Sequence, residues 1–253
     1  MTNLQVIIES AFQQRELQLL GCADENLTDA IKQTIVQLGE GSLRIADKVA
    51  GEWVVHQWLK KAILLSFDLP DFNKPNQSIH QHVESASASI CKSAYVAPTA
   101  TMMPCYIGQG AHIDHDCRIG SWVTVGCGVQ LGKKVQLCDG VVISNRLEPL
   151  AAKPTIIEDH CYIGARSVIA DGVVIEQGSI IATGVNIDQS TRIYDRQSNA
   201  TYHGRVPAGS VVVAGSLPDP TGTYSINAAI IVRTVDANTR MALGVAALLH
   251  AAL

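Results

Sequence analysis

The chain has 253 residues, a formal net charge of −4 and 47% hydrophobic residues. This charge balance offers no basic footprint for nucleic acid, and no apolar run in the sequence is long enough to cross a bilayer. The first residues lack a basic stretch followed by an apolar one, so no signal peptide is expected. Seven cysteines, an odd number without a CxxC pair, predict reduced thiols in a cytoplasmic protein rather than a disulfide framework or a metal site.

The first eighty residues predict a helical domain, residues 1–80. Apolar residues recur at helical spacing over 4–12 and again over 31–38. The segment 53–67 is so rich in apolar residues that it predicts a buried helix. Residues 68–89 carry prolines, asparagines, serines and alanines, and this composition predicts a weakly structured linker.

An aliphatic residue then returns at every sixth position, with one slip of a residue after Met102, one interruption after Ile143 and a final copy at Val206 and Val212. A second series of small or β-branched residues follows four positions after most of these aliphatics, and it includes Cys117 and Cys161. The aliphatic series is Ile90, Val96, Met102, Ile107, Ile113, Ile119, Val125, Leu131, Leu137, Ile143, Ile157, Ile163, Ile169, Ile175, Ile181, Ile187, Ile193, Val206 and Val212.

A period of six fits neither a helix nor a two-sided strand. It fits short strands joined by turns, with three hexads per triangular coil and residue n stacked on n+18. The sequence therefore predicts a mainly β fold, a parallel β-helix over residues 81–215, in which Cys117 and Cys161 are packing residues. Periodicity alone also admits a β-solenoid without catalytic activity. Beyond the coil, a strand over 223–235 and a helix over 238–253 predict a small extension, residues 216–253.

Several ordered stretches carry a resemblance that runs almost end to end. They are GEWVVHQWLKKAILLSF (51–67), SWVTVG (121–126), LEPL (147–150), PTIIEDHCYIGARS (154–167), QSTRIYDR (189–196) and GRVPAGSVVV (204–213). The chain resembles the tetrahydrodipicolinate N-succinyltransferases, hexapeptide-repeat acyltransferases of the diaminopimelate route to lysine. The resemblance implies a left-handed coil and a homotrimer with active sites between neighbouring coils. It also implies an acyl-CoA cosubstrate, succinyl-CoA or acetyl-CoA, laid along the coil and a small dicarboxylate acceptor beside it.

Acyl transfer to nitrogen needs a positioned base and a donor near the developing oxyanion, and a dicarboxylate acceptor favours arginine. The resemblance implies an arginine just before the coil and two acids within it. At these positions the chain has Val83, Gly120 and Val168. The segment 140–146, GVVISNR, also differs from the glycine-rich segment that the resemblance implies before LEP. These departures predict a divergent paralogue whose acceptor chemistry has changed or lapsed.

Other residues are candidates for these tasks. Asp188, His112 and His115 are candidate bases, although polar residues at the corners of such a coil are commonly only solvated. Arg146 is a candidate replacement for the missing arginine, with a plain surface arginine as the alternative. The resemblance places Glu148 and Arg166 in the acceptor cleft, and Trp122 either walls that cleft or is a buried structural residue. Candidate contacts to the acyl-CoA are Ala182 and Gly184 for the pantetheine arm and Arg233 and Arg240 for the phosphates.

Three functions stay open at this point. The first is an acyl-CoA-dependent N-acyltransferase of the diaminopimelate pathway. The second is an acyltransferase of specialised metabolism, for example of a tabtoxin-like pathway, with another acyl group or acceptor. The third is a non-catalytic paralogue that binds CoA or only assembles. None of them involves nucleic acid, a membrane or a bound metal.

Overall fold

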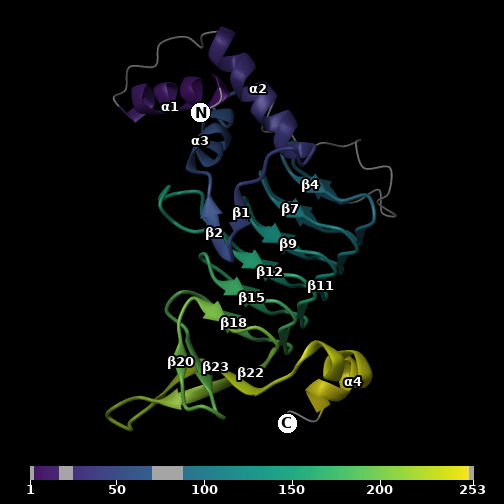
Figure 1. Cartoon of the computed structure of the whole chain (residues 1–253). Coiled ribbons are helices and arrows are strands. Elements are labelled where there is room, and N and C mark those ends of the chain that lie inside the picture. Colours follow the sequence, from purple (N-terminus) through teal and green to yellow (C-terminus); the bar gives the residue numbers. More distant parts are fainter. Residues whose placement is uncertain (1–2, 17–24, 70–87, 251–253) are drawn as a thin grey trace.

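The structure, a computed structural model, describes residues 3–16, 25–69 and 88–250. Its main body is a left-handed parallel β-helix, with a helical part at one end and a hairpin and helix at the other (Figure 1). Two-residue strands build three flat faces, and tight turns join them at three corners. This confirms the fold predicted from the period of six.

Each face collects every third strand of the coil. The first face contains β3 (Ser89–Ile90), β6 (Tyr106–Ile107), β9 (Thr124–Val125), β12 (Val142–Ile143), β15 (Val168–Ile169) and β18 (Asn186–Ile187). The second contains β4 (Tyr95–Val96), β7 (His112–Ile113), β10 (Gln130–Leu131), β13 (Ile156–Ile157), β16 (Val174–Ile175) and β21 (Arg205–Val206). The third contains β5 (Thr101–Met102), β8 (Arg118–Ile119), β11 (Gln136–Leu137), β14 (Tyr162–Ile163) and β17 (Ile180–Ile181).

The hexad aliphatics form one continuous core inside the coil. Val125 pairs with Ile143 one coil further on, so the spacing of eighteen holds where no residue is added or lost. All nineteen predicted aliphatics belong to this core, and Cys117 and Cys161 are fully buried in it. Burial raises the pKa of both thiols to about 12, which fits their predicted role as packing residues.

The N-terminal part places three helices at one end of the coil, and its hairpin lies alongside the coil (Figure 1). The helices are α1 (Asn3–Glu16), α2 (Glu25–Gly39) and α3 (Gln57–Ser66), and the hairpin is β1 (Ala46–Val49) with β2 (Glu52–Val55). The single helix predicted over 53–67 is wrong at its start, because residues 53–55 pair with β1 as a strand. The indole Nε1 of Trp53 donates to Glu158 of the coil, 2.9 Å away, and this contact anchors the strand.

The C-terminal part adds an antiparallel hairpin, β22 (Ser210–Pro218) with β23 (Ser225–Thr234), to the third face. β19 (Arg192–Asp195) and β20 (Thr201–Tyr202) extend the same sheet, and α4 (Ala237–His250) follows, broken at Gly244. The predicted strand and helix of this region are both present. The domain limit predicted between residues 215 and 216 falls inside β22, because that strand begins on the coil and continues into the hairpin.

Within the described residues, no helix is long and apolar enough to span a membrane. The division into domains 1–80, 81–215 and 216–253 stays a prediction.

Candidate active site

The corner that joins the third face to the first, here called the Trp122 corner, comprises residues 120–122, 138–140, 164–167 and 182–184. The residues at its apex stack from coil to coil through backbone hydrogen bonds: the amide of Trp122 donates to Pro104, and the amide of Arg166 donates to Asp139. Trp122 and Arg166 have φ of 61° and 57°, a conformation that Gly140 and Gly184 adopt at the equivalent turns. Side chains larger than glycine are rare in this conformation. Both side chains are nevertheless exposed at the apex of this corner.

Trp122 is 77% exposed, so the alternative of a buried structural tryptophan is wrong for this chain. A Cβ placed on Gly140 would lie 3.5 Å from Cγ of Arg166, so the arginine stem passes over the glycine between the two coils. Trp122 and Arg166, both exposed, thus lie one coil to either side of a turn that has no side chain of its own. This corner suits a ligand that is planar or carries a carboxylate. The indole offers a flat apolar face, and a guanidinium can donate two hydrogen bonds to one carboxylate.

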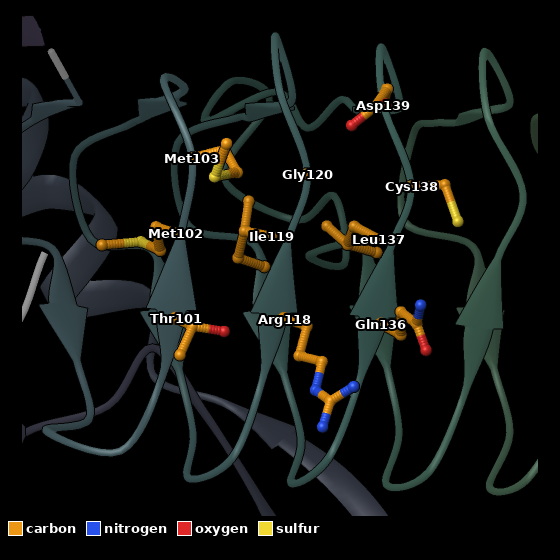
Figure 2. A pocket seen from close by; sticks show the side chains of 10 residues that line it. All are labelled: Thr101, Met102, Met103, Arg118, Ile119, Gly120, Gln136, Leu137, Cys138 and Asp139. Atoms are coloured by element: carbon orange, nitrogen blue, oxygen red, sulfur yellow. The ribbon is translucent and has the colours of Figure 1, made fainter. Parts of the chain in front are cut away.

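A shallow hollow of about 510 Å³ borders this corner on the third face (Figure 2). Its polar lining includes Arg118, Gln136 and Asp139, and its apolar lining includes Met103. Gly120 also lines the hollow, and a Cβ added there would lie only 2.6 Å from Oδ1 of Asp139. The carboxylate of the next coil therefore occupies the space beside position 120, where the resemblance implied an acid.

Sequence reasoning missed Asp139. The signal was present: Ile119 pairs with Leu137, so Asp139 falls one residue beyond the partner of Gly120. Val168 also lies beside this corner, half-buried on β15 with Val142 and Asn186 as strand neighbours, and it supplies no charge. Val83 lies outside the described residues.

Arg146 and Glu148 lie instead in the loop between the first and second faces. Nε of Arg146 is 3.2 Å from Oδ1 of Asp171, an exposed ion pair. The same loop receives the buried Lys60 of α3, whose ammonium donates to the carbonyls of Leu150 and Ala152 at 3.1 and 2.9 Å. Within one chain these two candidates are therefore not brought together with Trp122 and Arg166.

Asp188 lies at that same corner between the first and second faces, at the end of β18. Its Oδ1 accepts hydrogen bonds from the amides and hydroxyls of Ser190 and Thr191 at 2.7 to 2.9 Å. These bonds hold the pKa of Asp188 below its usual value. These hydrogen bonds close a turn. The Asp188 carboxylate is therefore a weak base, and it lies away from the Trp122 corner.

The two histidine candidates lie on the second face and just after it. His112 is buried, stacks on Tyr95 with ring centroids 4.7 Å apart, and has a pKa lowered to about 3 by burial and by Arg44. His115 is exposed, and its Nδ1 hydrogen-bonds with the hydroxyl of Thr99 at 3.3 Å. Neither lies on the strands or turns that form the Trp122 corner.

The two candidate arginines of the C-terminal part, Arg233 and Arg240, donate hydrogen bonds to different parts of the structure. Nη1 of Arg240 donates to the carbonyl of Gly178 at 2.5 Å, at the edge of a hollow of about 570 Å³ between α4 and the coil. Lys134 and Asp236 line the same hollow, so it offers two basic side chains and one acid, and the basic pair suits phosphate groups. Arg233 is turned toward α4, because its Nη2 donates to the carbonyl of Leu248 at 2.7 Å. Ala182 and Gly184 lie on the Trp122 corner, where no atom approaches within 4 Å of a Cβ added to Gly184.

A hexad coil that displays an aromatic ring, a guanidinium and a carboxylate along one corner has the architecture of a hexapeptide-repeat acyltransferase. The family model described as tetrahydrodipicolinate N-succinyltransferase N-terminal matches residues 3–69. The model described as hexapeptide repeat of succinyl-transferase matches residues 107–145 and 154–189. The chain belongs to the tetrahydrodipicolinate N-succinyltransferase family.

Curated relatives agree over the full length. The 2,3,4,5-tetrahydropyridine-2,6-dicarboxylate N-succinyltransferase of Idiomarina loihiensis is 45% identical, with 100% of both chains covered. The enzyme of the same name from Aeromonas salmonicida is 47% identical over 99% of this chain and 98% of its own. That from Acinetobacter baylyi is 44% identical over 95% of this chain and 96% of its own.

Proposed function

We propose that this protein is an acyl-CoA-dependent N-acyltransferase that moves a succinyl group to an amino or imino dicarboxylate of the diaminopimelate pathway to lysine. The observation that carries the proposal is the full-length identity of about 45% to relatives named for this reaction. The display of Trp122 and Arg166 on one corner supports it, because a guanidinium pairs well with a carboxylate of the acceptor.

The chain's own residues divide the work as follows. Arg166 binds a carboxylate of the acceptor, and Trp122 covers one side of it and excludes water. The open turns at Ala182 and Gly184 receive the pantetheine arm, and Arg240 with Lys134 receives the phosphates of the CoA. Acyl-CoA supplies the activated acyl group as a cosubstrate.

Arg146 and Glu148 come from a different corner of the coil, so in this proposal they reach the acceptor from a neighbouring subunit of a homotrimer. The protein acts in the cytoplasm on small molecules, without nucleic acid or membrane.

The test is a panel of succinyl-CoA and acetyl-CoA against amino-dicarboxylates, with release of the CoA thiol measured against a reaction without acceptor. Acceptor-dependent release, faster with succinyl-CoA, is the expected result. The absence of release with every pair would refute the proposal and favour the non-catalytic alternative.

A second candidate function is an acyltransferase of specialised metabolism, favoured by Gly120 and Val168 at the two positions where the resemblance implied acids. Expression of the gene in a strain that lacks the succinyltransferase step distinguishes the two. Full rescue of growth supports the pathway enzyme, whereas turnover of other acceptors without rescue supports the second candidate.

A further inference from the structure

The corner that displays Trp122 and Arg166 also contains a carboxylate. Among the described residues of the Trp122 corner, Asp139 is the only acid, and no histidine lies there. Its side chain is exposed and lines the hollow on the third face together with Arg118 and Gln136 (Figure 2). This exposed carboxylate therefore borders a ligand-sized hollow, and its backbone is hydrogen-bonded to that of Arg166 on the next coil.

The carboxylate is held in a fixed orientation. Oδ1 of Asp139 accepts a hydrogen bond of 2.7 Å from the amide of Ser121, and the backbone carbonyl of Asp139 accepts one of 3.0 Å from the amide of Arg166. Within the described part of the chain no partner is found for Oδ2. One oxygen therefore anchors the side chain to the coil, and the other is free to accept a proton.

Gly120 provides the room for this arrangement. Its missing side chain leaves the space in which Oδ1 of Asp139 lies, since a Cβ there would approach that oxygen to 2.6 Å. The other candidate bases lack such a position. Asp188 lies at the corner between the first and second faces, His112 is buried, and His115 lies in the turn after the second face.

We propose that Asp139 is the catalytic base of this protein, an inference that rests on the proposed function. The nitrogen of the acceptor forms a bond to the thioester carbonyl carbon, and Oδ2 of Asp139 accepts the proton that the nitrogen gives up. The carbon–sulfur bond breaks, and the CoA thiolate leaves and takes that proton. The products are the amide and free CoA, and the carboxylate is restored.

The chain contains a matched control for the structural part of this role. Oδ1 of Asp159 accepts a hydrogen bond of 2.8 Å from the amide of Lys133 and lies against Gly132 in the same way, but at the corner between the second and third faces. D139N and D159N both keep an oxygen that can accept the anchoring hydrogen bond. Only D139N removes a carboxylate from the Trp122 corner.

The experiment measures turnover, acceptor KM, CoA affinity and thermal unfolding for wild type, D139N and D159N. We expect D139N to lower kcat about 100-fold or more, with CoA affinity and thermal unfolding unchanged. We expect D159N to stay within about threefold of wild type, well below the effect of a lost general base. Equal losses in both variants, or a D139N enzyme as active as wild type, would overturn the role of Asp139 and leave the proposed function standing. An inactive wild type would overturn the proposed function and this role with it.

Discussion

Neighbouring side chains decide what each polar residue of this coil can do. His112 and His115 lie close in sequence, yet one is enclosed beneath Tyr95 and Arg44 and the other is exposed to solvent. Asp188 and Asp139 are both aspartates at corners. Oδ1 of Asp188 accepts four hydrogen bonds within its own turn, whereas Oδ1 of Asp139 accepts one from Ser121 of the preceding coil and lies beside the hollow on the third face.

His112 predicts an acid-dependent loss of stability. Its pKa in the folded protein is about 3, whereas an unfolded histidine titrates near 6.5. As the pH falls from about 6.5 toward 3, the unfolded chain takes up a proton that the folded chain refuses, so the free energy of unfolding decreases by at most about 1.4 kcal/mol per pH unit. His112→Phe keeps the ring on Tyr95 and removes the proton site, so it should flatten this dependence.

The measurement is urea unfolding at pH 7 and pH 4.5, with His115→Gln as the control at an exposed position. Identical pH dependence in wild type and His112→Phe would contradict the account.

Residue-level prediction from sequence succeeded where the cause was local. Ile113 and its hexad partners are buried because each turn of the coil repeats the same geometry, so the period alone identified them. The environment of His112 depends on Arg44, which is distant in sequence. Asp139 was missed because its relation to Gly120 appears only when coils are stacked in register.

At the scale of elements, α3 is fixed to the coil by a buried lysine. Lys60 is fully buried, and burial lowers its pKa. Its ammonium donates to carbonyls of the loop that carries Arg146 and Glu148. A helix of the N-terminal part therefore sets the shape of a loop that belongs to the coil. The high content of apolar residues in 53–67 predicted this helix. The same content did not distinguish the helix from strand β2, because β2 forms by pairing with β1 rather than by a local pattern.

Lys60→Met should lower the free energy of unfolding by about 2–4 kcal/mol, because the part-buried loop carbonyls lose the charged donor that a fully buried side chain supplies. Lys61→Met changes the adjacent, half-buried lysine, whose ammonium lies 5.6 Å from the ring of Phe12, and should cost less than about 1 kcal/mol. Chemical denaturation of both variants measures the difference. Equal stability of the two would show that the contacts of Lys60 do not hold the loop.

At the scale of the whole molecule, the candidate residues lie on different corners of one coil. The first face and the adjoining Trp122 corner display large apolar side chains, among them Met103, Tyr106 and Trp122. Apolar groups gathered in this way are typical of surfaces that contact another protein chain. The period of six predicted the coil, but no period reports how coils assemble.

For the proposed homotrimer, sedimentation equilibrium should give the mass of three copies of the chain. Tyr106→Glu places a charge on the first face and should shift the protein toward monomer, whereas Met241→Glu, at an exposed position of α4, should leave the trimer intact. A monomeric wild type, or dissociation by Met241→Glu alone, would contradict this arrangement.

The central claim is that acyl transfer takes place at the Trp122 corner. The most direct test is a crystal structure of the protein with CoA and an unreactive amino-dicarboxylate bound. We expect the CoA thiol and the acceptor nitrogen beside Asp139, with an acceptor carboxylate on Arg166. A thiol bound at the corner that carries His115, or on the second face beside His112, would contradict it.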